Sequence, residues 1–119
     1  MRINRSIIAT TLVSLLVLLS ACSKGDESMA WQKINQGALL VDVRTPAEFN
    51  AGHLPEASLI PVNEVEKRLG EFGDDKNRPI VVYCKSGARS GRAQSILLAN
   101  GYTDVTNGGG YQQLISAKP

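Results

Sequence analysis

Apolar residues along the chain fall into two groups. The first is an uncharged run from Ile7 to Leu19, which follows a start that carries Arg2 and Arg5. The second begins near residue 29, where short apolar runs alternate with helically spaced apolar positions and short polar connections. Such alternation is typical of an α/β fold with a mostly parallel sheet. The pattern therefore predicts a leader followed by one α/β domain.

Four segments of the second group predict strands. Residues 38–43 form an apolar run with a polar residue near its end, as in a buried strand that reaches the carboxyl edge of a sheet. Residues 79–83 are rich in β-branched side chains and have no polar break, so we expect this strand at the centre of the sheet. Residues 57–60 and the segment around Val105 predict two shorter strands.

Helix signals lie between and after these strands. Residues 45–48 read Thr-Pro-Ala-Glu, a capping box with proline at the first helical position, which predicts a short helix that ends near Gly52. Residues 63–66 predict another helix start, with Leu69 on its apolar face. Residues 89–100 carry apolar residues at helical spacing, and Gly101 follows as a C-terminal cap.

The C-terminal residues predict a turn and a closing helix. Residues 108–110 are three glycines, whose spacing does not match a dinucleotide-binding Gly-x-Gly-x-x-Gly motif. We therefore expect a turn there, followed by a helix over residues 111–116. Trp31 and Tyr83 are expected to pack in the core.

The leader has the features of an export signal. Its apolar run of about 13 residues is too short to cross a bilayer comfortably as a permanent helix. The residues that follow, Leu19-Ser20-Ala21-Cys22, resemble the lipobox of bacterial lipoproteins, in which the cysteine is lipidated and becomes N-terminal after cleavage. An ordinary cleaved signal or an uncleaved anchor is the alternative interpretation.

The lipobox resemblance implies a division of the chain and a location. We expect a signal peptide over residues 1–21, a lipidated N-terminus with a polar tether over residues 22–28, and the folded domain over residues 29–119. The residue after Cys22 is Ser23. In enteric-type lipoproteins Asp at that place favours the inner membrane, so the resemblance favours the outer membrane, facing the periplasm.

Composition and charge fit one small domain. The 119 residues, 43% hydrophobic and 20% charged, exclude a disordered, a collagen-like or a disulfide-rich chain. The formal charge is +2, but two of the 13 basic residues lie in the leader, which leaves 11 basic against 11 acidic residues. Without a basic excess we expect no nucleic-acid partner, and attachment to a membrane would come from acyl chains on Cys22.

The two cysteines, Cys22 and Cys84, have separate predicted roles. A lipidated Cys22 is a thioether and cannot form a disulfide, so Cys84 stays a free thiol. Cys84 follows the strongest strand and precedes a helix, at the carboxyl edge where α/β folds place their sites. An inert, buried cysteine at the end of a core strand is the alternative.

The residues after Cys84 favour a reactive thiolate. They read Lys85-Ser86-Gly87-Ala88-Arg89-Ser90, a polar, glycine-containing loop with two cations. A loop that curls there directs backbone N–H groups inward, and with the positive end of the next helix it forms an anion cradle. Cationic side chains and such donors lower the pKa of a cysteine. The loop therefore predicts a nucleophilic cysteine.

Three motifs together resemble single-domain rhodaneses. They are Val41-Asp42-Val43-Arg44 with Glu48, then Gly52-His53-Leu54-Pro55, then Tyr83 to Ser90, in the family's order and spacing from about residue 29 to residue 116. The resemblance implies an α/β fold with a parallel five-stranded sheet flanked by helices. It also implies that Cys84 takes a sulfane sulfur from a donor such as thiosulfate, forms a persulfide, and passes the sulfur to cyanide or a cellular thiol.

The same resemblance assigns roles to neighbouring residues. The loop Lys85, Ser86, Gly87, Ala88 and Arg89 would bind the small sulfur-containing anion, and Asp42, Arg44 and Ser90 would support it. His53 is expected to fix a turn rather than act as a base. No cofactor is implied, and with one histidine and one free cysteine we expect no metal. Glu56 stands where many relatives have glycine, which predicts a changed turn.

Two other function classes remain open from the sequence. Phosphatases and arsenate reductases also place a cysteine in an anion-binding loop that ends in arginine. Protein tyrosine phosphatases have five residues between the cysteine and the arginine, whereas four residues separate Cys84 from Arg89. A non-enzymatic module that carries sulfur or holds a partner is the second alternative.

Overall fold

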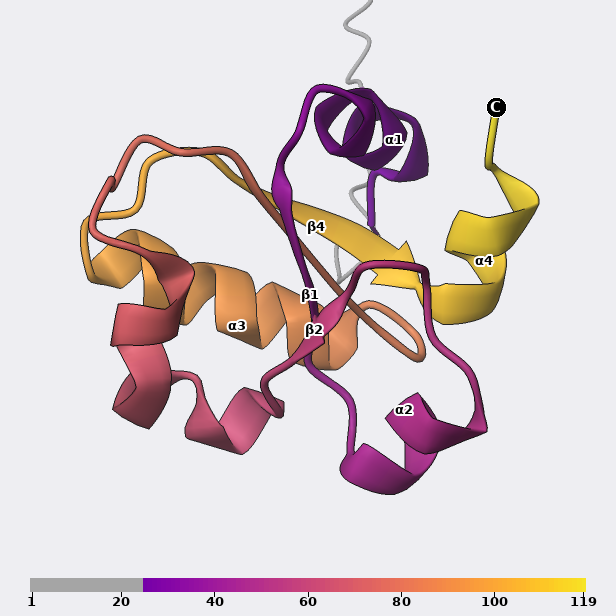
Figure 1. Ribbon diagram of the computed structural model, residues 1–119, viewed down its shortest axis with the longest axis horizontal. Coiled ribbons are helices and arrows are strands. Elements are labelled where there is room, and N and C mark those ends of the chain that lie inside the picture. The colour runs from indigo at the N-terminus through magenta and orange to yellow at the C-terminus, as the bar shows by residue number, and fades with distance from the viewer. Residues whose placement is uncertain (1–24) are drawn as a thin grey trace, which may run out of the picture.

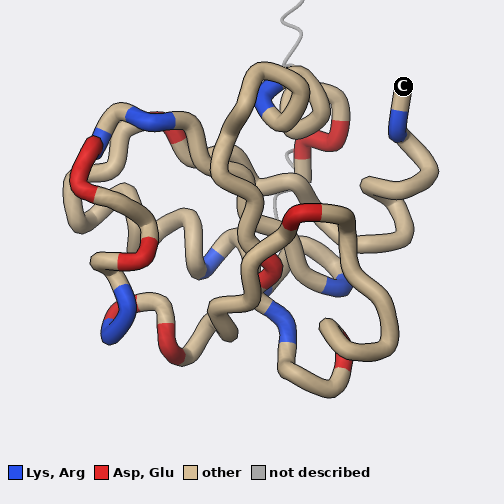
Figure 2. Tube along the Cα trace, viewed as in Figure 1, with Lys and Arg blue, Asp and Glu red and all other residues tan. Residues whose placement is uncertain are grey.

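The computed structural model describes residues 25–119. The predicted signal peptide and the predicted lipidation site Cys22 lie outside the described residues. No helix between residues 25 and 119 combines the length and the apolar character needed to cross a bilayer. Figure 2 shows that Lys and Arg alternate with Asp and Glu around the described chain, without a stripe of one sign.

A parallel sheet forms the centre of the domain (Figure 1). Its strands are β1 (Leu39–Asp42), β2 (Ser58–Leu59), β3 (Ile80–Cys84) and β4 (Val105–Gly110), in the order β2-β1-β3-β4. β3 lies between β1 and β4 and is buried along its whole length, so the prediction of a central strand is confirmed. Because all the strands run parallel, their carboxyl ends meet at one edge.

Helices cover both faces of this sheet. On one face lie α3 (Ala88–Ala99) and the 3₁₀ segments η1 (Val62–Glu64) and η2 (Glu66–Phe72), and on the other lie α1 (Glu27–Asn35) and α4 (Tyr111–Ser116). Successive side chains of β3 alternate between these layers, so Val82 and Cys84 pack towards α3 while Tyr83 packs towards α1 and α4. The alternation directs the Cys84 sulfur to the face that α3 covers.

The predicted helix after β1 is confirmed as α2 (Pro46–Ala51). Thr45 Oγ1 accepts from the Glu48 N–H while Glu48 Oε1 accepts from the Thr45 N–H, and proline occupies the first turn. The helices predicted over residues 89–100 and 111–116 are also present, as α3 and α4. In α3, Ala93 and Leu97 are completely buried, as their helical spacing indicates.

Two local predictions differ from the structure in different degrees. The helix predicted to start near Asn63 is present, with Leu69 packed against the core, but it consists of 3₁₀ segments whose backbone is non-helical at Arg68. The Arg68 guanidinium binds Glu64 and Glu71. The glycines at 108–110 belong to β4 and not to a turn, because β3 continues to pair with β4 as far as Cys84 and Gly110, with a register shift.

The described sheet has four strands, whereas the family resemblance implies five. At the free edge of β4, the Asp26 N–H donates to the carbonyl of Asn107 at 2.8 Å. The Asp26 side chain then caps α1 by accepting from the Met29 N–H. The chain therefore makes one backbone hydrogen bond to the edge of β4 and then enters the helix. Glu27 and Ser28, which the sequence assigns to the tether, therefore begin α1.

Candidate functional site

Cys84 is the last residue of β3 and its side chain has no exposure to solvent. The chain leaves the strand through a tight loop and enters α3 at Ala88. Gly87, immediately before that helix, has φ of 98°, a left-handed conformation that favours glycine. This turn allows the loop to fold back over the sulfur.

Three donors of the loop converge on the sulfur of Cys84. The Gly87 N–H lies 3.0 Å from Cys84 Sγ, and the Ser90 N–H and Ser90 Oγ each lie 3.3 Å from it. All three approach within ordinary distances for hydrogen bonds to sulfur, and Gly87 and Ser90 are themselves buried. The loop therefore directs three hydrogen-bond donors at one sulfur.

This arrangement lowers the pKa of Cys84 below its ordinary value. Burial of the thiol raises the pKa, because a charged sulfur is poorly solvated inside the protein. The hydrogen bonds of the Ser90 side chain and the backbone N–H groups of Ser90, Ser86 and Gly87 act in the opposite direction and outweigh the burial. The thiolate is therefore stabilised mainly by oriented neutral dipoles.

The cations of the loop contribute less directly than the sequence suggests. Arg89 forms an ion pair with Glu48 of α2, with distances of 2.8 Å and 3.0 Å from its two terminal nitrogens to the two carboxylate oxygens. Its charge is thus largely matched by an acid. Lys85 is exposed, and it forms no ion pair with another residue of the 25–119 segment. Ser86 and Ala88 are also exposed.

Asp42 and Arg44 bind each other at the end of β1. Arg44 Nη2 lies 2.6 Å from Asp42 Oδ2, and the same nitrogen donates to the carbonyl of Gly52 at 2.7 Å. The guanidinium also lies over the rings of Tyr83 and Tyr111. Arg44 therefore contacts Tyr83, the residue before Cys84 in β3. None of the side-chain hydrogen bonds of Asp42 and Arg44 reaches the loop after Cys84.

Two further residues complete the description of the site. His53 is exposed, stacks on Phe49 and makes a 2.8 Å hydrogen bond with the Phe49 carbonyl, which holds the turn after α2. Asn107 of β4 bonds to both Ser90 and Gly87, and the sequence analysis does not identify it. A lone asparagine before a glycine run has no local signal that connects it with a cysteine loop in another part of the chain.

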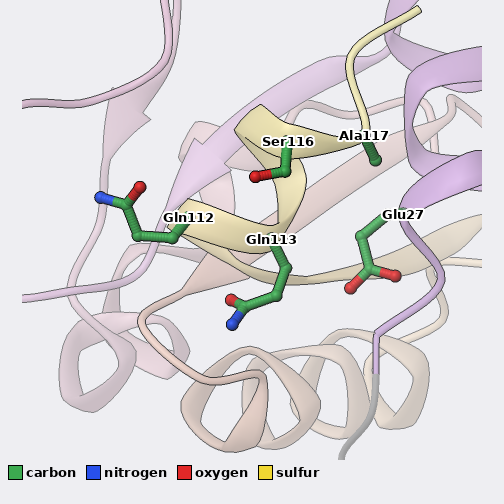
Figure 3. A pocket seen from close by; sticks show the side chains of 5 residues that line it. All are labelled: Glu27, Gln112, Gln113, Ser116 and Ala117. Atoms are coloured by element: carbon green, nitrogen blue, oxygen red, sulfur yellow. The ribbon is translucent and has the colours of Figure 1, made fainter.

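The surface pocket of Figure 3 is separate from the Cys84 loop. It has a volume of about 470 Å³ and lies between the start of α1 and α4, lined by Glu27, Gln112, Gln113, Ser116 and Ala117. No residue that the sequence assigns to the site lines it. Cys84 and the loop that follows it do not line this pocket.

The chain was compared with known proteins. A family model described as "Rhodanese-like domain" matches residues 26–117. Thiosulfate sulfurtransferase PspE of Escherichia coli is 40% identical over 66% of this chain and 75% of its own length. A protein named sulfurtransferase from Allochromatium vinosum is 43% identical over 60% of this chain and 65% of its own length. A solved structure, "rhodanese with anions from E. coli", has a TM-score of 0.64 and 38% identity, and the match covers 70% of this chain and 95% of that one.

Proposed function

This chain belongs to the rhodanese family, and we propose that it is a sulfurtransferase that moves a sulfane sulfur through a persulfide on Cys84. The observation that carries the proposal is the convergence of Gly87 N–H, Ser90 N–H and Ser90 Oγ on a completely buried cysteine sulfur. Hydrogen-bond donors held around one sulfur stabilise a negative charge on it before the substrate arrives. The relatives named as sulfurtransferases favour the same chemistry.

The first step is the uptake of sulfur from a donor such as thiosulfate. The thiolate of Cys84 attacks the outer sulfur of thiosulfate, a new S–S bond forms, and the bond to the sulfite group breaks with its electron pair on sulfite. One thiolate and one thiosulfate dianion thus give one persulfide anion and one sulfite dianion. Charge and atoms balance without an oxidant, and no proton is needed once Cys84 is ionised.

The second step returns the enzyme to its starting state. A thiophilic acceptor, cyanide in an assay or a thiol in the cell, attacks the outer sulfur of the persulfide. The S–S bond breaks with its electron pair on Cys84, which becomes a thiolate again. With cyanide the product is thiocyanate. In both steps the donors of Gly87 and Ser90 lie where the negative sulfur is held, so they support the persulfide as well as the thiolate.

Lys85, Ser86, Gly87, Ala88 and Arg89 are proposed as the loop that receives the anionic donor, with Ser90, Asp42 and Arg44 in support. The exposed Lys85 contributes a positive charge that no acidic residue of the 25–119 segment pairs with. Arg89 fixes the position of the loop through its ion pair with Glu48. A small anion therefore meets a cation and a row of N–H groups along the same short segment.

The test is a thiocyanate assay with thiosulfate and cyanide, with Cys84→Ser as the control. We expect turnover by the wild-type chain, none by the variant, and a gain of one sulfur atom on the Cys84 peptide after thiosulfate alone. If both proteins are equally inactive and no sulfur is added, the proposal fails. Release of phosphate from an aryl phosphate would instead favour the phosphatase class. Sulfur loading without turnover would favour a carrier module.

We also propose that the chain is anchored to the membrane by a lipid on Cys22, on the outer membrane and facing the periplasm. The Leu19-to-Cys22 motif supports this. Gly25 packs against Gly109, one residue before the Gly110 that pairs with Cys84. Two residues, Ser23 and Lys24, separate Gly25 from Cys22, and the three steps reach roughly 10 Å when extended, so a lipid on Cys22 would keep the domain close to a bilayer.

The anchor is tested by mass spectrometry of the N-terminal peptide from membrane-extracted protein. We expect cleavage before Cys22 and an acylated Cys22, and we expect Cys22→Ser to leave the membrane fraction. An unmodified cysteine in protein that still fractionates with membrane would refute the lipid anchor. Density separation of inner and outer membranes then decides the location.

A further inference from the structure

Asn107 is joined to the Cys84 loop by both ends of its side-chain amide. Its Nδ2 donates to the carbonyl of Gly87 at 3.1 Å, and its Oδ1 accepts from Ser90 Oγ at 2.7 Å. Oδ1 also accepts from the N–H of Gly109 at 2.9 Å. The carbonyl of Gly87 can only accept and the N–H of Gly109 can only donate, so these two bonds fix the orientation of the amide.

The two loop residues that Asn107 binds both donate to the sulfur. Gly87 donates through its N–H and Ser90 through its N–H and its Oγ, and the Ser86 N–H adds a further hydrogen bond that favours the thiolate. Asn107 itself lies on β4, next to β3 in the sheet, and its N–H and C=O groups belong to a strand rather than to the loop. A strand of the sheet thus holds the loop at two points.

We propose that Asn107 is a positioning residue that keeps the Gly87 and Ser90 donors directed at Cys84 Sγ. This inference rests on the proposed function only for its effect on turnover, because the effect on the thiolate is independent of the substrate. Gly87 lies in a left-handed conformation, and a bond to its carbonyl fixes the rotation of its peptide unit. The bond to Ser90 Oγ fixes the side-chain rotamer that places the hydroxyl 3.3 Å from the sulfur.

The Ser90 hydroxyl has one proton and two neighbouring acceptors, Asn107 Oδ1 and Cys84 Sγ. A thiolate is a stronger acceptor than an amide oxygen because it is charged. When Cys84 ionises, the proton turns towards sulfur, and Asn107 Oδ1 keeps its bond from Gly109. No buried acceptor is left without a donor, and Asn107 continues to hold the loop through its bond to the Gly87 carbonyl.

The experiment measures ionisation of Cys84 directly in the full-length chain with Asn107→Ala. The rate of alkylation of the Cys84 peptide by iodoacetamide is followed against pH by mass spectrometry, which separates this cysteine from Cys22. We expect the pKa of Cys84 to rise by about one unit, which slows alkylation about tenfold at a pH below both values. Turnover should fall at low pH and recover as the pH is raised.

Asn100→Ala is the matched control, because it also removes one amide that bonds to a backbone carbonyl, at the end of α3 and away from the loop. We expect its pKa profile to match that of the wild type. A second comparison uses Ser90→Ala alone and with Asn107→Ala, and the two effects should be less than additive because Asn107 acts partly through Ser90.

The outcomes are distinct. An unchanged Cys84 pKa in folded Asn107→Ala would overturn the positioning role. A lowered pKa would also overturn it, because Asn107 would then act by competing with the sulfur for the Ser90 proton. If the wild type transfers no sulfur while the pKa of Asn107→Ala still rises, the proposed function fails and the inference on Asn107 stands. Circular dichroism and thermal unfolding show whether the variant is folded.

Discussion

Glu48 and Arg89, 41 positions apart in sequence, form a two-bond ion pair that joins the capping residue of α2 to the first turn of α3. The hydrogen bond from Arg89 and the backbone N–H of Thr45 lower the pKa of the Glu48 carboxyl to about 2. One side chain therefore closes a helix cap and fixes the position of the helix that follows the Cys84 loop.

This pair predicts a dependence of stability on pH. Because the folded-state pKa of Glu48 lies below its ordinary value of 4.5, the pair stabilises the fold fully above about pH 4.5 and loses its effect as the pH falls towards 2. Glu48→Gln should lower the free energy of unfolding by about 1 kcal/mol at neutral pH. The difference from wild type should shrink in acid, as followed by urea unfolding. A difference that stays constant with pH would contradict this explanation.

Ser90 predicts a change in the chemistry of Cys84 without a large change in stability. Ser90→Ala removes one donor to the sulfur and leaves the N–H donors of Gly87 and Ser90 in place. A hydrogen bond to a charged group contributes about 1.5–3 kcal/mol, so the pKa of Cys84 should rise by roughly one to two units. Alkylation rate against pH measures the shift. Ser95→Ala, on an exposed position of the same helix, is the control and should not shift the profile.

Gly87 and Gly37 allow a matched test of the loop conformation. Both have φ of 98°, but only Gly87 lies next to Cys84. Alanine in the left-handed region costs roughly 1 kcal/mol, so Gly87→Ala and Gly37→Ala should destabilise the fold by similar amounts. Only Gly87→Ala should lose sulfur transfer, since its N–H would no longer reach the sulfur. Equal loss of activity in the two variants would show that the effect comes from stability alone.

Glu56 predicts a stabilising substitution. It is the one non-glycine residue with positive φ among residues 25–119, at 68°, and its side chain is exposed. Glu56→Gly removes the steric strain of a Cβ atom at positive φ and should raise the free energy of unfolding by about 1 kcal/mol. The larger conformational entropy of glycine in the unfolded chain offsets part of this gain. Glu56→Ala keeps the Cβ atom and should give no such gain. Denaturant unfolding of both variants decides the point.

The sequence predicts those parts of the fold that have short-range signals. The Thr45 and Glu48 capping box, the β-branched run of β3 and the spacing of Ala93 and Leu97 are all local, and the structure confirms the elements they predict. Within the site, the position of Cys84 at the end of a buried strand follows from the same reasoning. The comparisons agree with the family that the motifs indicate.

The rest depends on contacts that sequence spacing does not carry. The assignment of Gly108–Gly110 to β4 rests on pairing with β3, and Asn107 meets Ser90 only because those strands are neighbours. α1 has two buried residues, Ala30 and Trp31, which is a weak periodic signal. The sequence alone indicates that Arg89 is an unpaired cation, whereas in the structure it forms an ion pair with Glu48.

The complete burial of Cys84 has a consequence for its reaction with disulfides. Thiol–disulfide exchange requires a disulfide to approach a sulfur in line, and its rate depends on that access as well as on the thiolate fraction. A sulfur enclosed by its own loop ionises readily but remains out of reach of bulky disulfides such as those of other proteins. Steric exclusion thereby protects Cys84, the one cysteine among residues 25–119, from mixed-disulfide formation.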